Sequence, residues 1–270
     1  MIIVVEANTP ERIQASKARG LPSMASAYCA ALRRIVPELA CRTVAPHAGD
    51  TLDTEHASGI VFTGSTEDFA PSDPIAAPQR AAMEVALASG LPVFGSCNGM
   101  QLGALVLGGH LETSPTFELG LAREITLTET GRAHPMFAGK PPIFAAPALH
   151  RDRVAKLPDN AVLLAGNDHS PIQAFAYERD SIRFWGTQYH PELTLDQVAD
   201  IFAAREGIFD QAYDLVPDLR AIAAGNQDVA KNWGTTPQAQ SDPVRMSELA
   251  AFLRVAGFPP RDQSFKDAPR

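Results

Sequence analysis

The stretch Leu91-Pro92-Val93-Phe94-Gly95-Ser96-Cys97-Asn98-Gly99 joins a short apolar run to a segment with helical spacing. Such a run, followed by Gly-x-Cys-x-Gly and a helix, predicts a sharp elbow that raises a nucleophile above the carboxyl edge of a sheet. At the start of a helix, the positive end of the helix dipole favours the thiolate form of Cys97. Unpaired N–H groups of the first helical turn can bind an oxyanion. We therefore predict that Cys97 is a catalytic nucleophile rather than a structural buried cysteine.

The segments around this elbow alternate between short apolar runs and helical spacing. In the first half, the pattern predicts strands at 2–6, 41–45, 59–63 and 91–95, a polar loop at 8–22, and helices at 23–35, 74–89 and 97–107. This order indicates βαβ units, that is, an α/β fold with a doubly wound, mostly parallel sheet and helices on both faces. In the second half, we expect strands at 122–128, 142–146, 161–165, 172–177 and 182–188, then a helix at 194–205.

The sequence changes character after residue 205. Helical spacing at 209–224 and 243–256 is separated by a polar stretch. We therefore divide the chain into one domain at 1–205 and a C-terminal helical extension at 206–270, packed on the same domain. Two roles for the extension follow as hypotheses: it covers an edge of the sheet, or it forms a docking or dimer surface.

A partner for the thiolate follows the last predicted strand, in Gln188-Tyr189-His190-Pro191-Glu192. The carboxyl end of a strand is where an α/β sheet presents its active site, so His190 and Cys97 are expected at the same edge. Glu192 stands two positions further on, where an extended backbone projects it to the same side as His190. A carboxylate there can orient the imidazole, which predicts a Cys97–His190–Glu192 triad.

Composition narrows the class of protein. The 270 residues carry a formal net charge of -8, which disfavours a nucleic-acid partner because phosphate binding needs a concentrated basic face. The three cysteines have no CxxC spacing, so neither a disulfide framework nor a thiolate metal site is expected. No apolar run approaches the length of a membrane span, and no leader precedes the first strand. We expect a cytoplasmic protein with no membrane contact, no metal and no cofactor.

The residues 95–101, Gly-Ser-Cys-Asn-Gly-Met-Gln, together with the His-Pro-Glu segment, resemble the class I, triad-type glutamine amidotransferases. Further stretches are similar to that family, in family order: Thr63-Gly64-Ser65, Glu118-Leu119-Gly120, residues 149–154 (Leu-His-Arg-Asp-Arg-Val, as in the GMP-synthetase-like branch) and residues 170–175. The resemblance implies a flavodoxin-like fold. Two positions depart from the family pattern: Ser96 stands where an aliphatic residue is usual, and Asn98 where an apolar or aromatic residue is common.

What the resemblance implies for the site can be stated residue by residue. Cys97 would attack the carboxamide of glutamine, His190 would transfer the proton and Glu192 would orient His190. The backbone N–H groups of Ser65 and Asn98 would form the oxyanion hole. The substrate would contact Gly64, Gln101 and the backbone around His150. Thr66 stands where the family has proline, which leaves open whether the hole is preformed.

Three functions remain open at this stage. The first is a glutaminase that supplies ammonia to a separate synthase or ligase, because no phosphate-binding loop for a second reaction is found. The second is a hydrolase of other γ-glutamyl amides or peptides, which would use the same thioester chemistry with a different leaving amine. The third is a non-catalytic regulatory binder. A homodimer is a further prediction about its partners.

Overall fold

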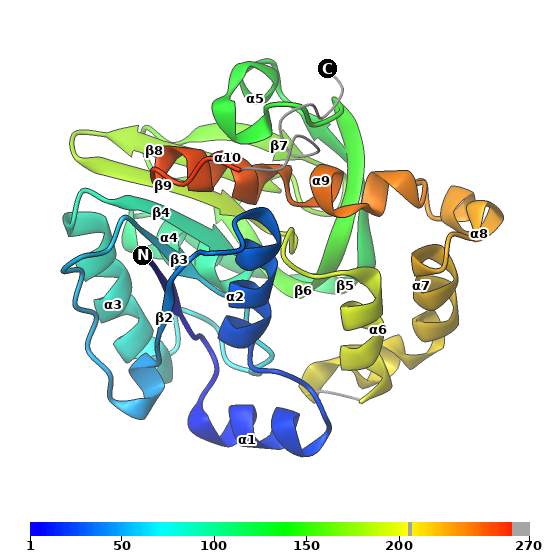
Figure 1. Cartoon of the computed structure of the whole chain (residues 1–270), viewed down its shortest axis with the longest axis horizontal. Helices are drawn as coiled ribbons and strands as arrows, with labels where there is room; N and C mark the ends of the chain where they lie inside the picture. The colour runs from blue at the N-terminus through cyan, green and yellow to red at the C-terminus, as the bar shows by residue number, and fades with distance from the viewer. Residues whose placement is uncertain (205–206, 261–270) are drawn as a thin grey trace.

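The computed structural model describes residues 1–204 and 207–260, and its centre is a nine-stranded sheet (Figure 1). The strands lie in the order β2-β1-β3-β4-β9-β8-β7-β5-β6. Their bounds are β1 Ile2–Val5, β2 Cys41–Val44, β3 Gly59–Phe62, β4 Pro92–Ser96, β5 His110–Leu127, β6 Ile143–Lys156, β7 Val162–Gly166, β8 Ala174–Arg179 and β9 Ile182–Thr187.

The half of the sheet from β2 to β9 is parallel. Its strands β1, β3 and β4 are buried along their whole length, which is why each reads as a continuous apolar run. Strand β9 pairs with β4 in parallel and with β8 in antiparallel orientation. In this register Ser96 lies opposite Thr187, so the chain leaves the sheet at the same edge just before Cys97 and just before His190.

Helices cover both faces of the parallel half. Ile2 and Val4 pack with α2 (Met24–Ile35) and α10 (Ser247–Val255) in one apolar cluster. Ile3 and Val5, whose side chains point the other way, pack with α3 (Ala77–Ala88) and α4 (Asn98–Val106) in a second cluster. Figure 1 shows α2 in blue and α10 in red in front of the sheet. The predicted α/β class with helices on both faces is confirmed.

The antiparallel half departs from the sequence prediction. The predicted strands 122–128 and 142–146 are parts of two much longer strands, β5 and β6, which pair with each other over most of their length. Register shifts interrupt the pairing, and one of them falls between Thr113 and Glu118. Strand β5 has many exposed polar residues, so over most of its length it lacks the apolar run that usually indicates a strand.

A second correction concerns the predicted loop 8–22. It contains helix α1 (Pro10–Ala18), which Thr9 caps by accepting a hydrogen bond from the backbone N–H of Arg12. Proline at the first helical position and a threonine before it are ordinary helix-start signals. The helix has few buried residues, so the apolar periodicity on which the prediction relied is absent.

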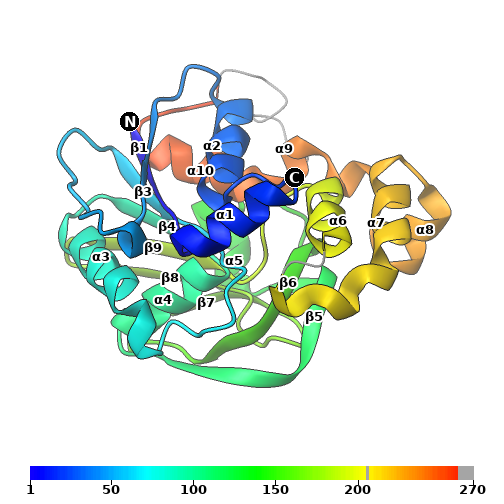
Figure 2. The ribbon, with the colours of Figure 1, turned by 90° about the horizontal axis from the view of Figure 1, so that it is seen from below.

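Besides a short 3₁₀ turn at Gln238–Gln240, the C-terminal part contains a longer 3₁₀ segment and four α-helices within residues 207–260. Their bounds are 3₁₀ Gly207–Leu215, α7 Val216–Ala223, α8 Gln227–Asn232, α9 Asp242–Arg245 and α10 Ser247–Val255. Helix α7 packs beside α6 (Leu195–Ala203), and Figure 2 shows α7 and α8 at one side of the molecule. Helix α10 lies on a face of the sheet instead, so it does not cover an edge.

The predicted division of the chain stays a prediction. Residues 205–206, at the proposed boundary, and residues 261–270, at the end of the proposed extension, lie outside the described residues. Among the helices that the structure does describe, none combines the length and the apolar character that crossing a membrane requires.

Candidate active site

Cys97 occupies the turn between β4 and α4 with φ 50° and ψ -109°. A positive φ is strained for a residue with a Cβ, and such strain concentrates at functional turns. Close packing explains the two glycines of the elbow. A Cβ on Gly95 would lie 2.5 Å from the carbonyl of Gly99, and one on Gly99 would lie 2.4 Å from the Phe62 carbonyl oxygen.

His190 and Glu192 form a buried hydrogen-bonded pair next to this turn. The distance from His190 Nδ1 to Glu192 Oε1 is 2.7 Å, and neither side chain exceeds 1% exposure. The backbone N–H of His190 donates to the Pro147 carbonyl of β6, and the N–H of Cys97 donates to the Thr187 carbonyl of β9. The loop that carries the histidine is thus fixed to the same strands as the elbow.

The remaining ring nitrogen of His190, Nε2, has no hydrogen-bond partner among the described residues. Burial lowers the pKa of His190, but the Glu192 carboxylate and the nearby Cys97 thiol outweigh burial and raise that pKa to about 10. With this pKa the imidazole of His190 is protonated at neutral pH, so it can donate a proton.

Ser96, one of the two departures from the family pattern, interacts with the same carboxylate. Its hydroxyl donates to Glu192 Oε1 over 3.2 Å, and this oxygen also accepts from His190. Ser96 ends β4 and is fully buried. A hydrogen bond to a buried carboxylate helps to hold it in place, so a polar residue at this position has a structural reason.

The predicted oxyanion turn follows β3. Asn8 holds it with two hydrogen bonds to Thr66: its Oδ1 accepts from the backbone N–H, and its Nδ2 donates to the hydroxyl. The backbone N–H groups of Ser65 and Asn98 donate to no other described residue, and both residues line one cavity with Cys97. The turn after β3 and the start of α4 thus each supply one free N–H, from Ser65 and Asn98, where the sequence predicted an oxyanion hole.

Gly64, expected to contact substrate, lies against His190. A Cβ at this position would lie 2.4 Å from Cε1 of the imidazole. This distance is much shorter than a van der Waals contact. The imidazole of His190 therefore occupies the space that a side chain at position 64 would need, and only glycine fits there.

A methyl group at position 64 should therefore displace the His190 ring from the thiol. We expect Gly64→Ala to lower the turnover rate by about 10- to 100-fold, because a misplacement of about 1 Å is worth about that much. Steady-state kinetics and a thermal melt would test this. An unchanged turnover rate in a normally folded variant would show that the ring tolerates the displacement.

The cavity beside Cys97 has a volume of about 410 Å³ and is lined by residues from both halves of the chain, including Gln101, Leu149, His150 and Asp152. The amide nitrogen of Gln101 donates to the Asp152 carbonyl over 2.7 Å and to Gln188 Oε1 over 3.2 Å. The carbonyl oxygen of its side chain accepts from no described residue. These two hydrogen bonds hold Gln101 at the cavity wall, and its side-chain carbonyl oxygen is left to accept a hydrogen bond.

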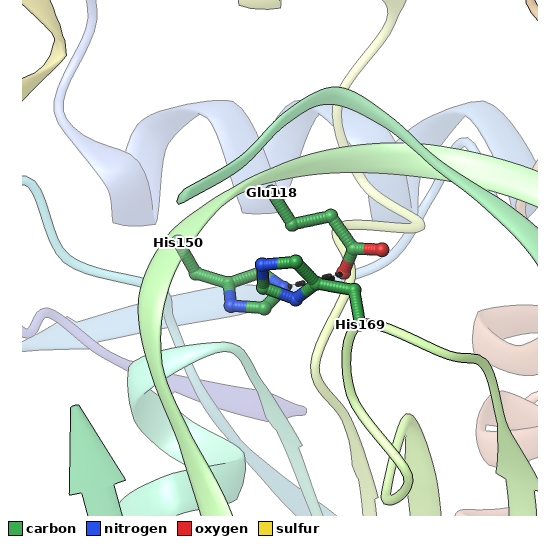
Figure 3. Close-up of side chains that lie close together, drawn as sticks. All are labelled: Glu118, His150 and His169. Carbon is green, nitrogen blue, oxygen red and sulfur yellow. Dashed lines mark hydrogen bonds and ion pairs between the residues drawn. The ribbon is translucent and has the colours of Figure 1, made fainter. Parts of the chain in front are cut away.

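His150, also on the cavity wall, belongs to a network with Glu118 and His169 (Figure 3). One potential ligand atom from each lies within 4.8 Å of the others, so the three could hold a metal ion by distance alone. Hydrogen bonds already use the carboxylate, however. Glu118 Oε2 lies 2.8 Å from His150 Nε2 and 2.7 Å from Gln173 Nε2, and Oε1 accepts from Asn167 over 2.7 Å.

These hydrogen bonds also affect the pKa values of Glu118 and His150. Burial raises the pKa of Glu118, but its hydrogen bonds from His150, Asn167 and Gln173 outweigh burial and leave that pKa below its ordinary value. Burial lowers the pKa of His150 against the pull of Glu118. A metal ion bound to Glu118 Oε2 would have to displace its contacts with His150 and Gln173. The network supports the cavity wall, and the expectation of no metal stays a prediction.

The structure brings together residues that the sequence pattern left unassigned. The Glu118 stretch was noted as similar to the family, but its contact with His150 was not predicted. Asn8 and Ser96 also hold parts of the site through side-chain hydrogen bonds. Polar positions beside strand ends are the signal that could have drawn attention to both.

Comparison with known proteins places this site in a family. The model of the glutamine amidotransferase class-I family matches residues 25–204. A γ-glutamyl-L-1-hydroxyisopropylamide hydrolase from a Pseudomonas species is 35% identical over 179 residues, which are 64% of this chain and 60% of that protein. A GMP synthase (glutamine-hydrolysing) from Enterobacter sp. (strain 638) is 35% identical over 141 residues, 51% of this chain and 26% of that protein. The chain thus spans less than two thirds of each relative.

Solved structures agree with the fold. A glutamine amidotransferase from Thermotoga maritima superposes with a TM-score of 0.67 at 16% identity, covering 94% of this chain and 97% of that one. At this identity the likeness concerns the fold alone. The match of the family model to two thirds of the sequence decides the assignment: the chain belongs to the class-I glutamine amidotransferase family.

Proposed function

We propose that this chain hydrolyses the side-chain amide of glutamine through a γ-glutamyl thioester on Cys97. The proposal depends on one arrangement: Cys97 lies on a strained elbow and contributes to the raised pKa of the buried His190. The imidazole of His190 is in turn hydrogen-bonded to the Glu192 carboxylate over 2.7 Å. A thiolate, a proton carrier and a group that orients the carrier are the parts that acyl transfer through a cysteine needs.

In this proposal the Cys97 thiolate attacks the amide carbon, and the carbonyl oxygen becomes an oxyanion held by the N–H groups of Ser65 and Asn98. A donor of this kind stabilises the transition state by about 3 kcal/mol. The imidazolium of His190 gives its proton to the leaving nitrogen, so ammonia departs and the thioester remains. A water molecule then attacks the thioester, His190 takes its proton, and glutamate leaves as the thiolate is restored.

A second substrate class has support of its own. The cavity extends beyond Cys97 to the aromatic side chains of Phe69, Phe117 and Phe209, with Arg151 above the Phe117 ring. Apolar surface there would suit an alkylamine leaving group better than ammonia. The Pseudomonas relative is named for such a γ-glutamyl amide. We therefore propose γ-glutamyl alkylamides as the alternative substrates.

If glutamine is the substrate, we propose that the ammonia passes to a separate synthase or ligase. The matched part is about a quarter of the Enterobacter GMP synthase, so most of that relative lies outside the match. A homodimer stays a prediction. The non-catalytic alternative has less support, because a binder would not need a buried His190–Glu192 hydrogen bond beside a cysteine on a strained turn.

The test is a substrate comparison on the purified protein. We expect release of glutamate from L-glutamine, γ-glutamylethylamide or both, with ammonia or ethylamine as the second product, and no release of aspartate from L-asparagine, which is shorter by one methylene. The ratio of the two kcat/KM values decides between the substrate classes. Failure of every γ-glutamyl amide, together with no labelling of Cys97 by 6-diazo-5-oxo-L-norleucine, would refute the proposed function.

A further inference from the structure

The loop that carries His190 and Glu192 is hydrogen-bonded to residues of the C-terminal helices α9 and α10. Arg245, at the end of α9, donates from Nη1 to the carbonyl oxygen of Pro191 over 2.5 Å. Pro191 lies between the two triad residues, and Arg245 is only 2% exposed. A guanidinium from a distant part of the chain thus fixes the peptide group between Pro191 and Glu192.

A second contact holds the other side of His190. The Tyr189 hydroxyl donates to Glu248 Oε1 of α10 over 2.5 Å. Glu248 Oε2 is in turn paired with the buried Lys140 Nζ at 2.9 Å, and Lys140 also donates to the Val244 carbonyl. The loop is therefore attached to α9 and α10 on both sides of the imidazole.

Charge also links Arg245 to the triad. Asp242 and Glu192 both stabilise the buried guanidinium electrostatically, and Asp242 is its direct ion-pair partner. Glu192 Oε2 and Arg245 Nε are buried, and neither has a hydrogen-bond partner among the described residues. One is an acceptor with negative charge and the other a donor with positive charge. Burying a charged group is costly without a nearby opposite charge, so the guanidinium and the carboxylate each reduce the cost of burying the other.

We propose that Arg245 is a positioning residue for the His190–Glu192 pair, so that the C-terminal segment 242–255 is part of the active-site framework. Arg245 lies about forty positions beyond the residues that the family model matches, so the family assignment gives it no role. Arg245 acts through Pro191 and Glu192 and does not line the cavity beside Cys97. The proposal rests on the proposed function, because it assigns Arg245 to the same triad.

The test compares Arg245→Gln, which removes the charge, with Arg245→Lys, which keeps the charge but not the planar fork. Arg34→Gln is the matched control. Arg34 pairs with the same Asp242 through its Nε at 3.2 Å, but its side chain is 40% exposed and no contact joins it to the His190 loop. All variants are made in the full chain, and their melting temperatures are recorded.

For Arg245→Gln we expect kcat to fall at least about 10-fold with KM changed less than about twofold, because the triad loses its alignment but the substrate cavity keeps its walls. The pH of half-maximal alkylation of Cys97 by iodoacetamide should move upward. Arg245→Lys should recover part of the rate, and Arg34→Gln should match the wild type. A purely structural role would lower the melting temperature without moving the alkylation profile.

The proposal is overturned if Arg245→Gln keeps the wild-type kcat and alkylation profile, or if Arg34→Gln loses as much activity. Should Arg245→Gln fail to fold, Arg245→Lys decides: a rate reduced about threefold or more supports the proposal, and a wild-type rate overturns it. Alkylation needs no substrate. If the wild type hydrolyses no γ-glutamyl amide, the proposed function fails while the profile still tests Arg245.

Discussion

Cys97→Ala is expected to reduce γ-glutamyl amide hydrolysis by at least about 10⁴-fold, the largest effect of any single change in this chain. Without sulfur no thioester can form, and the residual rate comes from the oxyanion donors and substrate binding alone. The fold should be retained, because the side chain is small and lies at a cavity wall. Initial rates and mass spectrometry of the acyl-enzyme would check this result.

The backbone of Cys97 supplies the control for this prediction. At φ 50° alanine carries the same strain as cysteine, whereas glycine does not. Cys97→Gly should be as inactive as Cys97→Ala but more resistant to denaturant, by about 1 kcal/mol. Equal stability of the two variants would show that the elbow stores no strain. Activity of either variant near the wild-type level would contradict the nucleophile assignment.

Glu192→Gln should have the second largest effect, a loss of turnover of about 100-fold or more. The amide has the same shape, but it cannot stabilise a protonated His190, so the pKa of the imidazole should fall from the raised value of about 10. Alkylation of Cys97 at neutral pH should then slow, because less thiolate is present. Ser96→Ala is the control: it removes one hydrogen bond from the carboxylate but keeps the charge, and should cost less than about 10-fold.

The same pair sets a dependence of stability on pH. The pKa of His190 is raised in the folded protein above its ordinary value of 6.5, so proton binding stabilises the fold. This contribution is complete below pH 6.5 and is lost as the pH rises through about 10. Melting temperatures measured between pH 6.5 and 10 should fall more for the wild type than for Glu192→Gln. Parallel curves would remove Glu192 as the cause of the raised pKa.

The sequence alone was sufficient to predict those parts of the site that depend on neighbouring residues in the chain. Glycines around Cys97 predict an elbow because only a residue without Cβ fits where Gly95 and Gly99 pack. The expected contact between His190 and Glu192 is present, but the backbone at 191–192 is a turn and not the extended segment on which the prediction relied. The parallel strands were found for a similar reason, since full burial leaves an apolar run that can be read directly.

Contacts between distant segments could not be predicted in the same way. Nothing near Arg245 in the sequence indicates that its guanidinium reaches Pro191, and Glu248 looks like an ordinary charge on a helix until Tyr189 and Lys140 are placed beside it. Ser96 was noticed only as a departure from the family pattern. In each case the meaning of a polar residue depends on which buried group the fold brings next to it.

The position of β9 next to β4 determines when Cys97 and His190 come together during folding. Strands β4 and β9 are neighbours in the sheet but stand about ninety positions apart along the chain, and pairings over such separations form late because closing a long loop is entropically costly. Until they pair, Cys97 has no imidazole beside it and remains an ordinary thiol. On the proposed mechanism, the nucleophile is therefore completed only at a late step of folding, after most of the chain is already packed.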